Sequence, residues 1–98
     1  FMQRHIGRIS YMHFKDIDPV VKTDVIAKGT GFYDACGQGI FCNLGDGDVD
    51  FPSVRQILLD HGFDGWCTVE QDCDPTLPDT DSLRDAKINR RYLQSIGF

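Results

Sequence analysis

The sequence predicts an α/β fold in which strands alternate with helices. Two short segments rich in β-forming residues, residues 9–17 and 66–71, each become polar at their C-terminal end and are each followed by helix-compatible sequence. Strands that alternate with helices pair in parallel through right-handed crossovers. A parallel sheet is normally buried on both faces and has more neighbours than two strands provide. We therefore expect these 98 residues to be the C-terminal part of a larger α/β protein.

The N-terminal residues predict the end of a helix. The chain opens on Phe1 instead of an initiating methionine, and no capping residue precedes the helix-compatible residues 2–8. Gly7 stands where a glycine commonly ends a helix. We expect from these features that a longer chain precedes this sequence.

Residues 9–17 predict the first strand. Because side chains alternate along a strand, His13 and Lys15 fall on one face, and Met12 and Phe14 fall on the other. The apolar face suits packing against a helix. The opposite face carries its polar side chains at the carboxyl end of the strand, where α/β proteins place their active sites.

The middle of the chain predicts two helical segments and a loop. Asp18-Pro19 ends the first strand, residues 20–28 are compatible with a helix, and residues 32–36 predict another short turn of helix. Residues 40–50 are rich in glycine and aspartate, which predicts a loop. The Asp-x-Asp-x-Asp run in this loop lacks the glycine and the glutamate that an EF-hand requires, so we do not assign it to calcium.

The C-terminal half predicts a helix and then the second strand. Asp50, followed by Pro52, predicts a helix start, and an apolar stripe at helical spacing continues towards Gly62. In the second strand, residues 66–71, the apolar face suits burial. Glu70 lies on the opposite face, at the carboxyl end.

The last predicted helix lies after a loop that contains proline. Its N-cap is one of three consecutive residues, Asp79, Thr80 or Asp81. The helix is expected to run to about Ile96, and Gly97 follows it. Its apolar positions are Leu83, Ala86, Leu93 and Ile96.

The composition is that of a globular domain with an acidic balance. Hydrophobic residues make up 41% and charged residues 26%, and the formal net charge is −5. Lysine and arginine are scattered, which argues against a nucleic-acid footprint, and no apolar run approaches the ~18 residues of a membrane span. No signal peptide is visible. We expect a cytoplasmic protein that binds neither nucleic acid nor membrane.

The four cysteines form two pairs, and five residues separate the members of each pair. This spacing is neither CxxC nor a usual zinc pattern. A disulfide framework and a zinc site are the alternatives, but we favour reduced thiols in a cytosolic protein. The cysteines are Cys36, Cys42, Cys67 and Cys73.

A histidine and a glutamate are the candidate metal ligands. His13 and Glu70 are each predicted at the carboxyl end of a parallel strand, on the same face, and we expect the two strands to be neighbours. Imidazole and carboxylate together suit a divalent metal such as Mn, Co, Zn or Mg. Lys15 would point into the same space. In the alternative interpretation, His13 makes a structural hydrogen bond and Glu70 extends into solvent without a chemical role. We assign no chemistry to His5 or His61.

Three segments resemble the xylose-isomerase-like sugar isomerase and epimerase barrels, and among them the C-terminal part of the inosose dehydratases. They are HFKDIDP (13–19), GIFCNLGDGDVDF (39–51) and DGWCTVEQDCDP (64–75). The inosose dehydratases dehydrate a keto-inositol in myo-inositol catabolism. The resemblance implies a TIM (β/α)8 barrel, of which residues 1–98 would be the C-terminal portion of a single domain and its last two strand–helix units.

The resemblance also implies the composition of the site. The family's divalent metal is held by a glutamate, an aspartate, a histidine and a final glutamate. His13 matches the histidine and Glu70 the final glutamate, whereas the other two ligands would lie on earlier strands. Lys15 matches a substrate-contacting residue. The metal would bind oxygens of a cyclic keto-polyol and stabilise an enediolate, while Glu70 assists proton transfer and Lys15 polarises the carbonyl or protonates the departing hydroxyl.

Other functions stay open. A sugar isomerase or epimerase would use the same metal without losing water, and a barrel fragment without catalysis would act as an assembly module. DNA repair of the endonuclease IV type is opposed by the acidic balance. We expect the isolated chain to be inactive and to associate with another copy or with the rest of a barrel, because its strands have open edges.

Overall fold

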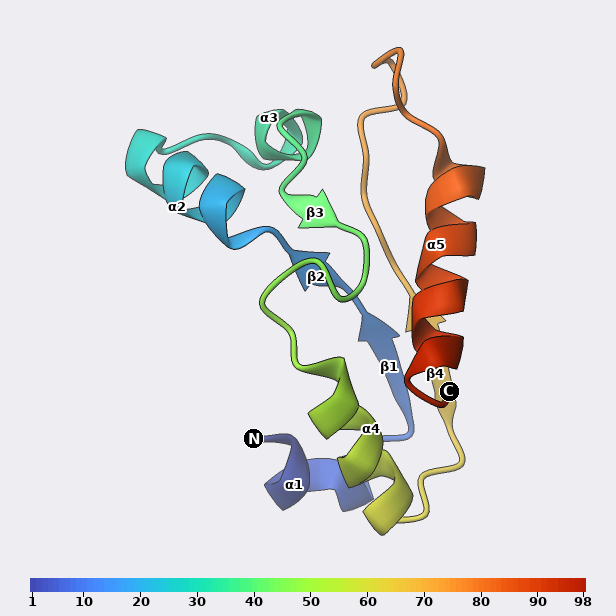
Figure 1. The fold of residues 1–98 in the computed structure, drawn as a ribbon. Coiled ribbons are helices and arrows are strands. Elements are labelled where there is room, and N and C mark those ends of the chain that lie inside the picture. Colours follow the sequence, from blue (N-terminus) through green and yellow to red (C-terminus); the bar gives the residue numbers. More distant parts are fainter.

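The computed structural model describes all 98 residues, and its centre is a two-stranded parallel sheet. Strand β1 (Tyr11–Phe14) pairs with β4 (Trp66–Val69), and the two strands lie side by side in Figure 1. Helix α4 (Phe51–Asp60) belongs to the connection between them, and α5 (Ser82–Ser95) follows β4. The predicted pair of neighbouring parallel strands is confirmed.

The N-terminal segment is helical, but it ends differently from the prediction. Helix α1 (Met2–His5) has Ile6 as its C-cap, and a 3-10 turn, η1 (Ile6–Arg8), follows directly. Gly7 lies inside this turn. The prediction of a glycine cap at Gly7 is therefore wrong, because the chain tightens into a 3-10 turn and does not need a left-handed residue to leave the helix.

The strand predicted over residues 9–17 is divided at Lys15. After that residue, β2 (Asp16–Ile17) pairs in antiparallel fashion with β3 (Phe41–Cys42), which forms a second, smaller sheet. The loop predicted over residues 40–50 thus contains a strand that the sequence analysis missed. A strand of two residues is too short to show an alternating pattern.

Helices α2 (Pro19–Lys28) and α3 (Phe32–Gly37) extend beyond the carboxyl end of β1, at the top of Figure 1. The Asp18 side chain accepts hydrogen bonds from two backbone N–H groups of the first turn of α2. Pro19, the first residue of the helix, also favours a helix start at this position. Gly29, with a φ of 63°, ends the helix in the left-handed conformation.

Aspartate caps also fix the starts of α4 and α5. Asp50 accepts hydrogen bonds from the backbone N–H of Ser53 at 3.0 Å and from its hydroxyl at 2.6 Å. Asp81 accepts from the backbone N–H of Arg84 at 2.9 Å, so it is the N-cap among the three predicted candidates.

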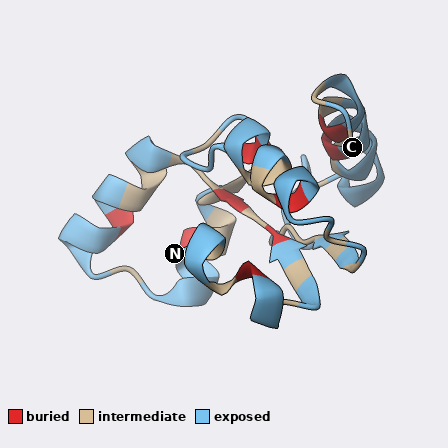
Figure 2. Ribbon diagram, turned by 90° about the horizontal axis from the view of Figure 1, so that it is seen from below, coloured by how far each residue is buried: buried red, intermediate tan, exposed pale blue.

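The core lies between the sheet and the helices α4 and α5, and it is small. Ten of the 98 residues are buried, and Figure 2 shows that most of the helical surface is exposed. Leu83 is 66% exposed, so it does not join the predicted apolar face of α5, because the first turn of this helix extends past the end of β4 (Figure 1). The core cluster consists of Ile6, Phe14, Leu44, Phe51, Leu58 and Leu93.

One face of the parallel sheet is uncovered. Tyr11 is 52% exposed and Trp66 is 80% exposed on this face, and each of the two strands has one edge without a partner strand. Large aromatic side chains on an open face mark a surface suited to contact with other protein. No helix of the structure combines the length and the apolar character needed to cross a membrane.

The four cysteines are free thiols, and they differ in burial. Burial, with a contribution from the charge of Asp16, raises the pKa of the Cys42 thiol to about 11, whereas Cys73 is exposed. We predict that iodoacetamide at about pH 8 modifies Cys73 first and Cys42 last, since only the thiolate reacts and it makes up about one thousandth of Cys42 at that pH. Peptide mass mapping over time measures both rates, and equal rates would contradict the prediction.

Candidate functional site

His13 and Glu70 meet at the carboxyl end of the parallel sheet. His13 lies opposite Thr68 in the strand register, and Glu70 follows two residues later on the same face. The backbone N–H of Glu70 donates to the carbonyl of Phe14 at 2.9 Å, which continues the ladder past β4. His13 Nδ1 and Glu70 Oε2 lie 2.5 Å apart. The expected approach of these side chains is confirmed, and their role as metal ligands stays a prediction.

Lys15 lies beside this pair, in the space where it was predicted. Its Nζ donates to Glu70 Oε1 at 2.8 Å and also to Asp72 Oδ2. The same Nζ lies 4.1 Å from the centre of the Phe41 ring. The structure therefore adds two residues, Asp72 and Phe41, that sequence reasoning did not place at the site.

The hydrogen bonds of the site favour its charged forms. Donation from Lys15 and from His13 lowers the pKa of the Glu70 carboxyl below its ordinary 4.5. For Lys15, burial lowers the pKa, but the hydrogen bonds to Asp72 and Glu70 outweigh it, so the pKa lies above the ordinary 10.5. At neutral pH the site therefore holds the Lys15 ammonium group next to the ionised Glu70 carboxylate.

Tyr11 lies two residues before His13 on the same face of β1 and supports the His13 imidazole. Its hydroxyl lies 2.6 Å from the Thr68 hydroxyl, which links the side chains of the two strands. Its ring meets the His13 ring edge to face, with a centroid distance of 5.2 Å. The orientation of His13 is thus set by an aromatic neighbour as well as by Glu70.

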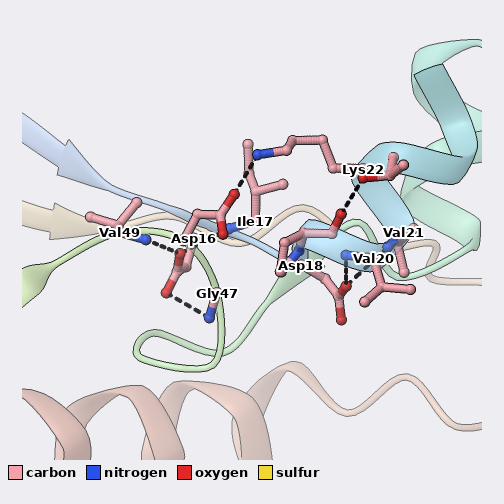
Figure 3. Close-up of polar contacts among 11 residues, drawn as sticks. Asp16, Ile17, Asp18, Val20, Val21, Lys22, Gly47 and Val49 are labelled. Atoms are coloured by element: carbon pink, nitrogen blue, oxygen red, sulfur yellow. Dashed lines mark hydrogen bonds and ion pairs between the residues drawn. The ribbon is translucent and has the colours of Figure 1, made fainter.

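Asp16 anchors the loop that follows β3. This residue is completely buried, and its carboxylate accepts four backbone hydrogen bonds. Figure 3 shows the loop curving around the Asp16 side chain. The contacts fix the direction in which the chain leaves Lys15. The donors are the N–H groups of Ile17 at 3.0 Å, Gly45 at 2.9 Å, Gly47 at 3.2 Å and Val49 at 3.1 Å.

A buried amide network ties the end of β4 to β3 and α5. Gln71 donates through Nε2 to the carbonyl of Phe41 at 3.4 Å, and its Oε1 accepts from Asn89 Nδ2 at 2.8 Å. Asn89 is 2% exposed and accepts from the backbone N–H of Leu44 at 2.8 Å. Sequence reasoning missed this network. The one sequence feature that could have indicated the network is that Asn89 stands four residues before Leu93, on the apolar face of the helix.

The donor atoms fit a divalent metal, although this chain supplies only two of them. The His13 imidazole and the Glu70 carboxylate are nitrogen and oxygen ligands of the kind such cations accept, and they are in direct contact. No group of three or more histidine, cysteine, aspartate or glutamate side chains is arranged to hold a metal ion. A complete coordination sphere therefore needs ligands beyond these two.

The α/β arrangement agrees with what sequence comparison shows. A family model described as the xylose isomerase-like TIM barrel matches residues 1–96, and the chain belongs to this family. The resemblance inferred from the three motifs is confirmed. The family relation also supports an α/β fold for the protein.

Several curated relatives that resemble the chain are inosose dehydratases. An inosose dehydratase of Bacillus licheniformis is 39% identical over 92 residues, which cover 94% of this chain and 30% of the relative. The inosose dehydratase of Klebsiella pneumoniae strain 342 is 38% identical over 76 residues, 78% of this chain and 25% of the relative. That of Bacillus velezensis is 34% identical over 94 residues, 96% of this chain and 31% of the relative. The chain spans less than a third of each.

Proposed function

We propose that the complete protein dehydrates a cyclic keto-polyol, an inosose such as 2-keto-myo-inositol, as a metal-dependent carbon–oxygen lyase of myo-inositol catabolism. The observation that carries this proposal is the contact of His13, Lys15 and Glu70 at the carboxyl end of two neighbouring parallel strands. TIM-barrel enzymes place their active sites at this end of the strands. The similarity to inosose dehydratases supports the substrate class.

The chain itself is proposed to be the C-terminal portion of a single barrel domain, its last two strand–helix units. The two parallel strands, each followed by a helix, and the much greater length of the relatives support this assignment. We further infer a cytoplasmic location, where the four free thiols would stay reduced.

His13 and Glu70 would hold a divalent metal, Mn, Co, Mg or Zn, together with ligands from the rest of the barrel. When bound, this metal supplies a Lewis acid for the substrate's oxygens. The ionised Glu70 carboxylate can accept a proton at an oxygen atom. The Lys15 ammonium can bind a carbonyl oxygen or donate a proton from Nζ to a departing hydroxyl.

A sugar isomerase or epimerase is the second candidate function, because the family is described by its likeness to xylose isomerase. Such an enzyme removes a proton from carbon and returns one to the neighbouring carbon or to the opposite face of the same carbon, and the same carboxylate and ammonium can assist both steps. The two functions differ in whether water leaves the substrate.

The deciding experiment uses the complete protein loaded with each of the four metals in turn. The protein is offered an inosose and, separately, a panel of aldoses and ketoses. We expect a product lighter by one water from the inosose, and no product from protein stripped of metal. Interconversion of the sugars without loss of water would establish the alternative. Inactivity towards both substrate classes would support an assembly module.

We predict that the isolated chain is inactive and not a stable monomer. Its parallel sheet has open edges, and Trp66 and Tyr11 lie exposed on the uncovered face. A second copy or the rest of a barrel is the proposed partner. Sedimentation at micromolar concentration tests this, with the expected result being an associated species. A compact monomer that unfolds cooperatively and dehydrates inosose would contradict the prediction.

A further inference from the structure

We propose that Asp72 and Phe41 are positioning residues for Lys15, which hold its ammonium group at the site while Glu70 is engaged by another ligand. The inference rests on the proposed function, in which Glu70 binds a metal. It adds two residues to that site, one from the segment after β4 and one from the small second sheet.

Glu70 is shared between two neighbours. Its Oε2 contacts His13 Nδ1 at 2.5 Å, and its Oε1 accepts from Lys15 at 2.8 Å. When the Glu70 carboxylate rotates towards a metal cation, its hydrogen bonds to His13 and Lys15 weaken. Lys15 then needs other contacts to stay in place, since a free lysine side chain has many rotamers.

Asp72 provides the first of these contacts. Its Oδ2 accepts a hydrogen bond from Lys15 Nζ, independently of Glu70. Asp72 also balances charge. Lys15 and Glu70 alone would be neutral together, whereas the addition of Asp72 leaves one negative charge in excess. An ammonium group near a divalent cation is repelled, and a second carboxylate offsets this repulsion.

Phe41 provides the second contact. The Lys15 ammonium lies over its ring, 4.1 Å from the centroid, where the ring quadrupole attracts a cation. The ring is held by its backbone: Phe41 pairs with Ile17 across the small sheet, and its carbonyl accepts from Gln71 at 3.4 Å. Phe41 is thus placed without any help from Lys15, as a positioning residue must be.

The first test observes Lys15 directly by NMR on the complete protein labelled with 15N-lysine. An ammonium held in ion pairs exchanges slowly with water and gives a visible resonance at low temperature, and Lys15→Arg identifies it. We expect the resonance to persist in Glu70→Gln and to disappear in Asp72→Asn. Asp64→Asn, which removes an exposed carboxylate at the far end of β4, is the matched control and should retain it.

Two results of this first test would overturn the proposal. One is an Asp72→Asn protein that keeps the resonance unchanged, and the other is a wild-type protein without it. The backbone amide spectrum of each variant shows whether the fold is intact. Phe41→Leu gives a second readout, since loss of the ring should remove the upfield shift of the Lys15 ε-methylene protons. An unchanged methylene shift would refute the role of Phe41.

The second test measures the complete protein with an inosose. Asp72→Asn should lower kcat by about tenfold or more, with KM and metal content nearly unchanged, because it disturbs a proton-transfer group and not a ligand. An unchanged kcat would overturn the proposal. If the NMR results hold but the wild-type protein does not dehydrate the substrate, the proposed function fails while the positioning of Lys15 stands.

Discussion

Asp16→Asn should lower the thermal unfolding midpoint of the chain by more than about 10 °C. Each carboxylate oxygen of Asp16 accepts two backbone N–H groups in a fully buried position. Asparagine keeps one oxygen and turns an NH2 group towards the other two donors. Each buried donor left without an acceptor costs about 1–3 kcal/mol. For a domain of this size, about 1 kcal/mol corresponds to a shift of roughly 4–8 °C.

Asp46→Asn is the matched control for this prediction. Asp46 lies in the same loop, is exposed, and accepts no hydrogen bond through its side chain, so its replacement should leave the midpoint nearly unchanged. Circular dichroism of both variants at one protein concentration makes the comparison, since association makes the midpoint depend on concentration. Equal midpoints for the two variants would show that the Asp16 contacts contribute little.

The structure of this loop also explains why position 47 is a glycine. A Cβ atom on Gly47 would lie 2.4 Å from Asp16 Oδ1 and 2.5 Å from the carbonyl oxygen of Ile17. The loop backbone approaches the buried carboxylate so closely that a side chain has no room. The glycine- and aspartate-rich sequence, which predicts only a loop, therefore encodes a specific packing arrangement.

The parallel pair and its polar ends could be predicted because both depend on local patterns. Alternation along two short strands places His13 and Glu70 on one face, and the order of strands and helices requires parallel pairing. The structure has both features. The same alternation places Asp16 on the apolar face with Met12 and Phe14. A carboxylate at such a position could have identified Asp16 as the buried residue that anchors the loop after β3.

The remaining parts of the site depend on tertiary contacts that leave no periodic signal. Phe41 reaches Lys15 through a two-residue strand, which is too short for a pattern. Asp72 lies beyond the end of β4, where the alternation is no longer defined by a ladder. The burial of Asn89 follows from how α5 packs against the end of β4, and the sequence of a helix does not specify its neighbour.

The second large effect is expected at Glu70, the only glutamate of this chain. In the complete protein, Glu70→Gln should weaken metal binding and lower turnover by about 100- to 10,000-fold or more. The amide has no negative charge for a cation or for Lys15, and one of its two terminal atoms is a donor where Glu70 accepts from both His13 and Lys15.

The pKa of Glu70 adds a pH dependence to this prediction. Hydrogen bonds from Lys15 and His13 lower that pKa, so the folded state favours the carboxylate. The stabilising contacts are therefore fully present above the ordinary pKa of 4.5 and are lost as the pH falls through the lowered value. Wild-type metal binding at mildly acidic pH should thus not decline through protonation of Glu70. Any decline there has to come from another group.

Metal content by elemental analysis and kcat with inosose, measured on the same preparations, test the role of Glu70. The control is Asp64→Asn, which removes one exposed carboxylate of the same charge from the start of the same strand segment. We expect the control to keep both metal and activity, while Glu70→Gln loses both. A Glu70→Gln protein with full turnover and unchanged metal content would show that this carboxylate is only a structural partner of Lys15 and His13.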